Sequence, residues 1–311
     1  MIPIILNEKD AACNCKFLQD FHQEIPVLYT LGVTAMEKYV NVTCWGSRGS
    51  CAAPHTNRME YGGNTSCFVI ETESVILILD AGSGIVPFGD ALIGRRTELR
   101  KDICLLFGHL HLDHIIGLPS FKPIYRPEYR VWIYGGGRTG GILEEQLETV
   151  FGPPYWPVRL RDCPAYAGSR GIMAGTGIEL PGDISVRAVK ANHPDQTVSY
   201  GIFINGKKIV YALDCELDQE TERELLSFAA DADLLICDAQ YSQEDYEVHR
   251  GWGHSAWPQW AGLAAQCNVR EVWLSHYAWE YCDEDLRTLE NKLKKVLPRA
   301  SCAKEGMEIR L

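Results

Sequence analysis

Six residues that follow one apolar segment constrain this chain more than any other feature. The segment Ile103–Phe107 is a short apolar run, which is typical of a strand buried on both faces. Directly after it come three histidines and one aspartate: His109, His111, Asp113 and His114. In extended backbone, residues 109, 111 and 113 share one face, and a turn brings residue 114 round to them. Imidazoles and carboxylates are ligands of zinc and similar ions, so the cluster predicts a metal site at the end of a buried strand.

Three further candidate ligands are scattered through the second half of the chain. His193, Asp214 and His276 each lie at or just past the carboxyl end of a predicted strand. Sites in α/β folds commonly collect at such ends. Together with the first cluster they make five histidines and two aspartates. That number suits a two-metal hydrolase with a bridging carboxylate and open positions for water.

Strand-like and helix-like segments alternate over most of the sequence. We expect strands at Tyr39–Cys44, Cys67–Glu71, Val75–Leu79, Ile103–Phe107, Arg130–Tyr134, Ile184–Val189, Ser199–Ile204, Lys208–Leu213, Leu234–Cys237 and Glu271–Leu274. We expect helices at Ile142–Phe151, Glu220–Ala229, Ala256–Gln266 and Asp283–Val296. Strands first in hairpins and then alternating with helices predict a layered α/β or α+β domain. No linker interrupts this pattern, so we expect a single domain over residues 39–311 and an N-terminal extension over 1–38.

Composition excludes several classes of protein. The net charge is −11, from 30 basic and 41 acidic residues, whereas a protein that binds duplex nucleic acid normally needs a basic face. We therefore expect no nucleic-acid partner. No stretch approaches the ~18 apolar residues of a membrane span, and the first residues lack the basic region of a signal peptide. The twelve cysteines are scattered without a framework spacing, which favours reduced thiols and a cytoplasmic location.

Several motifs resemble a known family. The HxHxDH pattern at residues 109–114, with His193, Asp214 and His276 following in order, resembles the metallo-β-lactamase superfamily. Seven further motifs resemble its cyclic-nucleotide phosphodiesterase-like subgroup, which is related to tRNase Z: CWGSRGS, YGGNTSC, LDAGSG, GLPSFKPIY, PPYWPV, CDAQYS and GWGHS. They span residues 44–277. The resemblance implies a four-layer αββα sandwich and a metal-dependent hydrolase.

The resemblance also implies a role for each ligand. His109, His111 and His193 would hold one metal ion. Asp113, His114 and His276 would hold the other, and Asp214 would bridge the two. We expect two divalent ions, with Zn²⁺ first and Mn²⁺ or Fe²⁺ as alternatives.

Three catalytic residues follow from the same comparison. His254 of GWGHS matches a histidine that assists the leaving oxygen, and Asp238 is expected to orient it. Asp238 stands where the relatives have the glutamate of a His-Glu-Ala-Thr motif. Asp113 is expected to accept a proton from the nucleophile as well as to bind metal. Asn64, Thr65 and Ser66 are candidate substrate contacts, because small polar groups and backbone amides can approach a phosphate.

The expected activity is hydrolysis of a small cyclic phosphodiester, foremost a 3′,5′-cyclic nucleotide, by a metal-activated hydroxide. Two alternatives stay open: an RNA nuclease of tRNase Z type, and a thioester or lactone hydrolase on the same fold. Tyr155 and Trp156, which lie between prolines, are candidates for the wall of the substrate pocket. Partly apolar arms such as residues 1–38 often make oligomer contacts, so we also consider a homodimer.

Overall fold

A computed structural model of the chain describes residues 39–95, 102–136 and 142–311. The predicted N-terminal extension lies outside the described residues. Its role, the domain boundary and the homodimer therefore stay predictions.

Two seven-stranded sheets are present within the described residues. The first has the strand order β14-β1-β2-β3-β4-β5-β6, with β1 (Asn41–Gly46), β2 (Cys67–Glu71), β3 (Val75–Leu79), β4 (Asp102–Phe107), β5 (Arg130–Gly136), β6 (Tyr166–Ile172) and β14 (Glu308–Arg310). The second has the order β13-β12-β11-β10-β9-β8-β7, with β7 (Gly177–Leu180), β8 (Ile184–Lys190), β9 (Val198–Ile204), β10 (Lys207–Ala212), β11 (Leu234–Asp238), β12 (Glu271–Ser275) and β13 (Ala300–Cys302).

Each sheet has an antiparallel half and a parallel half. In the first sheet, β1, β2 and β3 pair antiparallel, and β3 to β6 pair parallel. In the second, β7 to β10 pair antiparallel, and β10 to β13 pair parallel. The carboxyl ends of β3 and β4 therefore lie at one edge of the first sheet. Those of β8, β10, β11 and β12 lie at one edge of the second.

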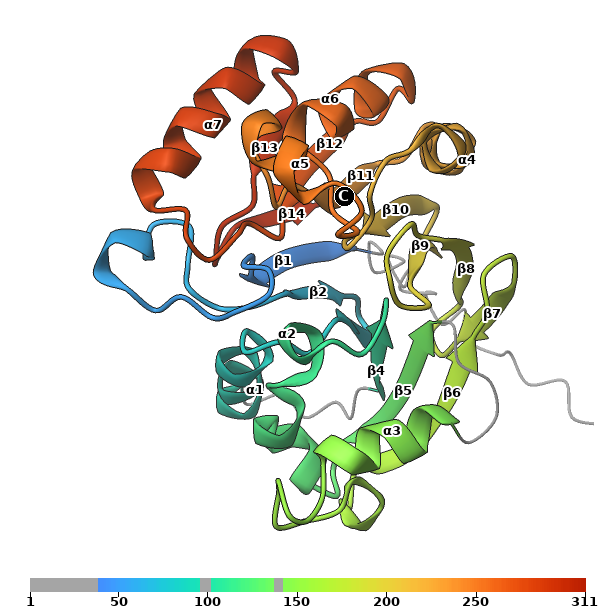
Figure 1. Ribbon diagram of the computed structural model, residues 1–311. Coiled ribbons are helices and arrows are strands. Elements are labelled where there is room, and N and C mark those ends of the chain that lie inside the picture. The colour runs from blue at the N-terminus through green and yellow to red at the C-terminus, as the bar shows by residue number, and fades with distance from the viewer. Residues whose placement is uncertain (1–38, 96–101, 137–141) are drawn as a thin grey trace, which may run out of the picture. The chain divides into compact units, whose positions relative to one another are not determined.

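Helices cover the outer face of each sheet, which makes four layers (Figure 1). They are α1 (Ile85–Gly94), α3 (Ile142–Val150), α4 (Gln219–Ala229), α6 (Trp257–Gln266) and α7 (Asp283–Val296). Two shorter helices, α2 (Leu112–Ile115) and α5 (Gln243–His249), follow β4 and β11. Apolar side chains of the two sheets pack against each other in one core. A second core lies between the second sheet and α4, α6 and α7, and a third between the first sheet and α1 and α3. The predicted αββα sandwich is confirmed.

Every predicted strand and helix is present, with bounds shifted by a few residues. Several elements that the sequence pattern did not indicate also form. Helix α1 contains Pro87 and Gly89, which lower helix propensity. Gly89 is nevertheless required there, because a Cβ at this position would lie 2.9 Å from the ring of Phe121. Tertiary packing thus outweighs local preference in α1.

Two further features concern the cysteines and the lengths of the helices. The ten cysteines of the described residues are all free thiols. Among the helices of these residues, none is both long enough and apolar enough to cross a membrane.

Helix α4 begins at a capping residue that gives a first test of the fold. The Asp218 carboxylate accepts hydrogen bonds from the backbone N–H groups of Glu220 (3.1 Å) and Thr221 (2.8 Å). We expect Asp218→Ala to lower the free energy of unfolding by about 1 kcal/mol, and Asp218→Asn to change it less. Chemical denaturation measures both.

The pH dependence of this effect has a defined sign. The hydrogen bond from the Thr221 N–H is the largest cause that lowers the pKa of Asp218. The stabilisation is therefore present at neutral pH and is lost as the pH falls through the lowered pKa. Wild type and Asp218→Ala should converge in acid. A difference between them that persists at all pH values would contradict the capping role.

Candidate metal centre and active site

The seven predicted ligands all follow the carboxyl end of a strand. Those from the first sheet come from the turn after β4 and from the short helix α2 that this turn begins: His109, His111, Asp113 and His114. Those from the second sheet follow β8, β10 and β12: His193, Asp214 and His276. The two sheets thus contribute ligands from opposite sides.

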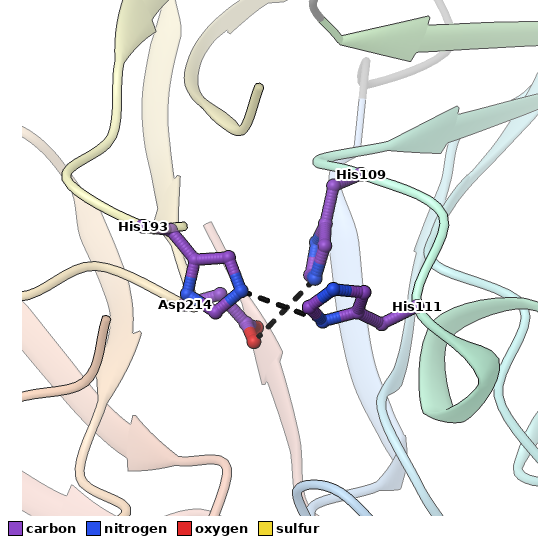
Figure 2. Close-up of side chains that lie close together, drawn as sticks. All are labelled: His109, His111, His193 and Asp214. Carbon is purple, nitrogen blue, oxygen red and sulfur yellow. Dashed lines mark hydrogen bonds and ion pairs between the residues drawn. The ribbon is translucent and has the colours of Figure 1, made fainter. Parts of the chain in front are cut away.

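One group consists of His109, His111, His193 and Asp214, whose ligand atoms all lie within 4.8 Å of one another. Figure 2 shows their side chains pointing toward a common centre. Nε2 of His193 lies 3.4 Å from Nδ1 of His111, and Nε2 of His109 lies 3.8 Å from Oδ1 of Asp214. Within this group His109 and Asp214 are buried, and His111 is exposed. One side of the group is therefore open to a ligand.

A second group consists of Asp113, His114 and His276, all buried. Nε2 of His276 lies 3.2 Å from Oδ2 of Asp113, and Nε2 of His114 lies 3.3 Å from the same oxygen. Asp214 joins this group to the first, since its Oδ2 is 3.0 Å from His114 Nε2 and 3.2 Å from His276 Nε2. Its two oxygens therefore face different groups.

The donor atoms fit divalent ions. Nε2 of His109, Nε2 of His114 and Oδ2 of Asp214 are buried and have no hydrogen-bond partner among the described residues. Leaving a buried polar atom unpaired costs about 1–3 kcal/mol. Three such atoms that converge on shared neighbours are explained by cations that bind between them. Imidazole nitrogens and carboxylate oxygens are the donors that zinc and related metals prefer.

The protonation of the ligands reflects their crowding. Burial lowers the pKa of His276, but the carboxylates of Asp214, Asp113 and Asp238 outweigh burial and raise it to about 9. Burial opposes ionisation of Asp214, yet His276, His114 and His109 hold its pKa well below the usual range. In the absence of metal, the positive charge of His276 offsets part of the negative charge of these carboxylates. Metal binding must then displace protons, so metal affinity should rise with pH.

Asp80 is a member of the site that sequence reasoning did not single out. Its Oδ2 accepts hydrogen bonds from His114 Nδ1 (2.6 Å) and from the hydroxyl of Tyr211 (2.6 Å). The first bond leaves Nε2 of His114 facing Asp113 and Asp214. A carboxylate behind a ligating histidine is a common arrangement that fixes the ring and its tautomer. Asp80 belongs to the LDAGSG motif directly after β3, which was the available signal.

Backbone conformation at the strand ends aims these side chains. Asp80, Asp214 and His276 have positive φ values of 60°, 51° and 65°, which are uncommon for residues other than glycine. Such conformations cost about 1–3 kcal/mol each and cluster at functional sites. All three residues follow a strand and turn their side chains into the ligand groups.

His254 and Asp238 form a pair beside the shared carboxylate. Nδ1 of His254 lies 2.8 Å from Oδ2 of Asp238, and Nε2 of His254 lies 3.9 Å from Oδ1 of Asp214. Asp238 is fully buried at the end of β11. The shorter aspartate therefore reaches the histidine. Asp214, His254 and His276 also converge closely enough to share an ion.

Glu216 is a second residue that the sequence did not indicate. This largely buried carboxylate accepts hydrogen bonds from the N–H of Gly251 (2.9 Å), the N–H of Gly253 (3.1 Å) and the hydroxyl of Tyr246 (3.0 Å). The carbonyl of Gly253 in turn lies 3.1 Å from Nδ1 of His193. Glu216 thereby holds the loop before His254, and this loop orients a metal-ligand candidate.

The three predicted substrate contacts are engaged within the protein. Nδ2 of Asn64 donates to Glu305 (3.0 Å), and the side-chain oxygen Oδ1 of Asn64 accepts from the Ser83 hydroxyl (2.9 Å). The Thr65 hydroxyl accepts from the N–H of Ser83 (2.8 Å). Ser66 is buried and donates to the carbonyl of Arg48. Contact between these residues and a substrate stays a prediction.

A cavity of about 470 Å³ opens beside the histidines. His111, His193 and His254 are among its lining residues, so it adjoins both the ligand groups and the His254–Asp238 pair. Tyr155 and Trp156 do not line it. Tyr155 is 74% exposed, and Trp156 donates to the Tyr125 hydroxyl (2.9 Å). The aromatic residues of this wall lie instead after α5 and after β12.

The role of Asp80 can be tested on metal affinity. We expect Asp80→Asn to weaken binding of a divalent ion 10–100-fold, because the charge that orients His114 is lost. Competition with a chromophoric chelator measures the affinity, and circular dichroism checks the fold. Tyr211→Phe is the matched control, since it removes the other hydrogen bond to the same oxygen. Unchanged affinity in Asp80→Asn would show that His114 needs no carboxylate behind it.

Comparisons with known proteins agree with this geometry. The Beta-lactamase superfamily domain matches residues 77–277. The Ribonuclease Z of Bradyrhizobium diazoefficiens is 23% identical over 72% of this chain and 87% of its own length. The metallo-beta-lactamase fold protein YhfI from Bacillus subtilis has a TM-score of 0.65 at 18% identity, with 88% of this chain and 100% of that chain covered. Human tRNase Z, short form, has a TM-score of 0.61 at 20% identity, with 86% and 98% covered.

The family match covers more than half of the chain and includes the HxHxDH turn, His193, Asp214 and His276. Both sheets and their covering helices have the arrangement of the related structures. The chain belongs to the metallo-β-lactamase superfamily, as a metal-dependent hydrolase related to tRNase Z.

Proposed function

We propose that this hydrolase is a dinuclear-metal phosphodiesterase. The observation that carries the proposal is the His254–Asp238 pair, which lies beside two ligand groups that share Asp214. A thioester needs no such acid, because a thiolate leaves without a proton, whereas the alkoxide that leaves a phosphodiester must be protonated. The combination supports phosphodiester cleavage above the other reactions of the fold.

The proposed ligand roles follow the two groups. His109, His111 and His193 would hold one ion, Asp113, His114 and His276 would hold the other, and Asp214 would be shared by both. When bound, two divalent ions would supply an activated water and polarise a phosphoryl oxygen. We propose zinc, because histidine nitrogens dominate the donor set. Metal analysis of the purified protein tests the identity and the number of ions.

The chain's own residues then manage the protons. The N–H at Nδ1 of His254 donates to Asp238, which leaves Nε2 facing the ligand groups. A proton on Nε2 can pass to the leaving oxygen while Asp238 stabilises the positive ring. On the other side, Oδ2 of Asp113 accepts from the N–H of Ser50 (2.7 Å), so its orientation is fixed. We assign Asp113 as the group that receives the proton of the attacking water.

A small cyclic phosphodiester, foremost a 3′,5′-cyclic nucleotide, is the substrate that we propose. The cavity beside the histidines has the volume of a small-molecule site. Its two carboxylate side chains, Asp245 and Glu280, are accompanied by no lysine or arginine among the described lining residues. Away from the ligand groups, a long polyanion would find no basic side chain among these residues.

RNA is the second candidate, because the Bradyrhizobium diazoefficiens relative bears the name Ribonuclease Z. That relative gives no support to the exclusion of nucleic acid that the net charge led us to expect. A ribonuclease would cleave RNA with an affinity that falls steeply as salt increases. Assays of cyclic nucleotides and of a structured RNA with a 3′ extension, over a range of salt concentrations, separate the two substrates.

The role of His254 gives a prediction that depends on the leaving group. We expect His254→Ala to lower kcat for a cyclic nucleotide at least about 10²-fold. Hydrolysis of bis(4-nitrophenyl) phosphate should fall much less, because nitrophenolate leaves without a proton. His55→Ala is the control, since His55 is an exposed histidine that does not line the cavity.

Two results would contradict this mechanism. An equal loss of both activities would assign His254 to metal binding. Turnover of thioesters or lactones without turnover of any phosphodiester would replace the proposed reaction class.

The role of Glu216 gives a further prediction. Glu216→Gln loses the charge that holds Gly251 and Gly253, so His254 and His193 are both less well placed. We expect kcat to fall about 10-fold or more and the bound metal to exchange faster. Glu224→Gln on the exposed side of α4 is the control. Wild-type kcat in Glu216→Gln would show that the loop keeps its position without this carboxylate.

A further inference from the structure

The cavity beside the histidines has one part that the proposed mechanism does not use. His111, His193 and His254 belong to the catalytic side. The remaining wall is built mainly from the segment between β11 and the end of α5 and from the segment after β12, and it carries Trp252, Trp279 and Glu280. These residues have no role in metal binding or proton transfer, and the cavity connects them to the groups that do.

Two tryptophans on this wall are exposed to an unusual degree. Trp252 is 60% exposed and Trp279 is 44% exposed, although large apolar side chains normally gain by burial. Neighbouring rings support Trp252. His249 stacks on Tyr241 with ring centroids 4.6 Å apart. The Trp252 ring packs edge-to-face against His249 with centroids 4.8 Å apart. The indole at residue 252 is thus supported by other rings and leaves surface free for a flat partner.

The charged groups on this wall are two carboxylates, those of Asp245 and Glu280. The Asp245 carboxylate already accepts from the hydroxyls of Ser242 (2.8 Å) and Tyr281. The Glu280 carboxylate is exposed and has no hydrogen-bond or ion-pair partner among the described residues. A ligand that lies against the tryptophans can therefore bring N–H donors to Glu280.

We propose that this wall binds the base of a single nucleotide, with Trp252 and Trp279 contacting its ring and Glu280 accepting from its amino group. The inference rests on the proposed phosphodiesterase function and names its substrate class: a 3′,5′-cyclic mononucleotide with an amino-bearing base. Aromatic side chains stack on any base, so they supply affinity without choosing among bases. Carboxylates accept from the amino group of cytosine but repel the carbonyl oxygen that uracil carries in its place. A second phosphate beside Asp245 and Glu280 would meet negative charge.

The test compares two rings that differ only along one edge of the base. Cytidine and uridine 3′,5′-cyclic monophosphates carry an amino group and a bare N3 in the first, against a carbonyl oxygen and an N3–H in the second. The base-free ring of 1-O-methylribose 3′,5′-cyclic phosphate keeps the scissile bond and lacks the whole base. For the metal-loaded full chain, kcat and KM are measured on all three compounds.

Three variants and two controls are assayed in the same way. We expect Trp252→Ala and Trp279→Ala to raise KM for the cytidine ring about 10-fold each, with kcat and the base-free ring little affected. Glu280→Gln should abolish the preference for cytidine over uridine, because an amide can both donate and accept. Tyr155→Ala removes a more exposed aromatic ring outside the cavity, and Glu284→Gln removes an exposed carboxylate on α7. Both controls should match wild type.

The outcomes separate this inference from the function on which it rests. Equal KM values for the base-free and cytidine rings would overturn base binding while leaving the phosphodiesterase intact. A preference for cytidine that survives Glu280→Gln would overturn the role of that carboxylate. Absence of turnover on all three rings, with two metal ions bound per chain, would overturn the proposed function and this inference together.

Discussion

The site depends on one buried carboxylate, that of Asp214. It follows β10 in a left-handed backbone conformation, and its two oxygens face different groups of histidines from the two sheets. A buried charge of this kind is unfavourable unless opposite charges surround it. The histidines satisfy this requirement in part, and the unpaired atoms that remain define where cations belong. The fold therefore brings two sheets together around a charge that neither could bury alone.

Much of this arrangement could be predicted from the sequence. The HxHxDH turn follows an apolar strand, and parallel strands gather their carboxyl ends at one edge, so the meeting of the turn with His193, Asp214 and His276 was expected. His254 and Asp238 were also paired in advance, and the structure places them 2.8 Å apart. These residues are recognisable because their chemistry is rare and their spacing relative to strands is regular.

The remaining parts had no local signal. Asp80 and Glu216 resemble ordinary acidic residues in the sequence, and only the fold brings Asp80 to His114 and Glu216 to the loop before His254. The aromatic wall was sought at Tyr155 and Trp156 because prolines flank them. It lies at Trp252 and Trp279, which are 27 residues apart in sequence and meet one cavity. Long-range contacts of this kind are decided by the packing of whole elements.

The loop before His254, which Glu216 holds by hydrogen bonds to Gly251 and Gly253, contributes both to the orientation of His193 and to the position of His254. A Cβ at residue 253 would lie 2.1 Å from Nδ1 of His193, so only glycine lets the backbone carbonyl reach this ring. The next residue along the chain, His254, is the proposed proton donor. Displacing this short segment would thus release a ligand and withdraw the acid in one movement. In an enzyme built this way, local unfolding of this segment abolishes activity altogether. The protein then does not persist as a metal-loaded hydrolase that has lost its selectivity.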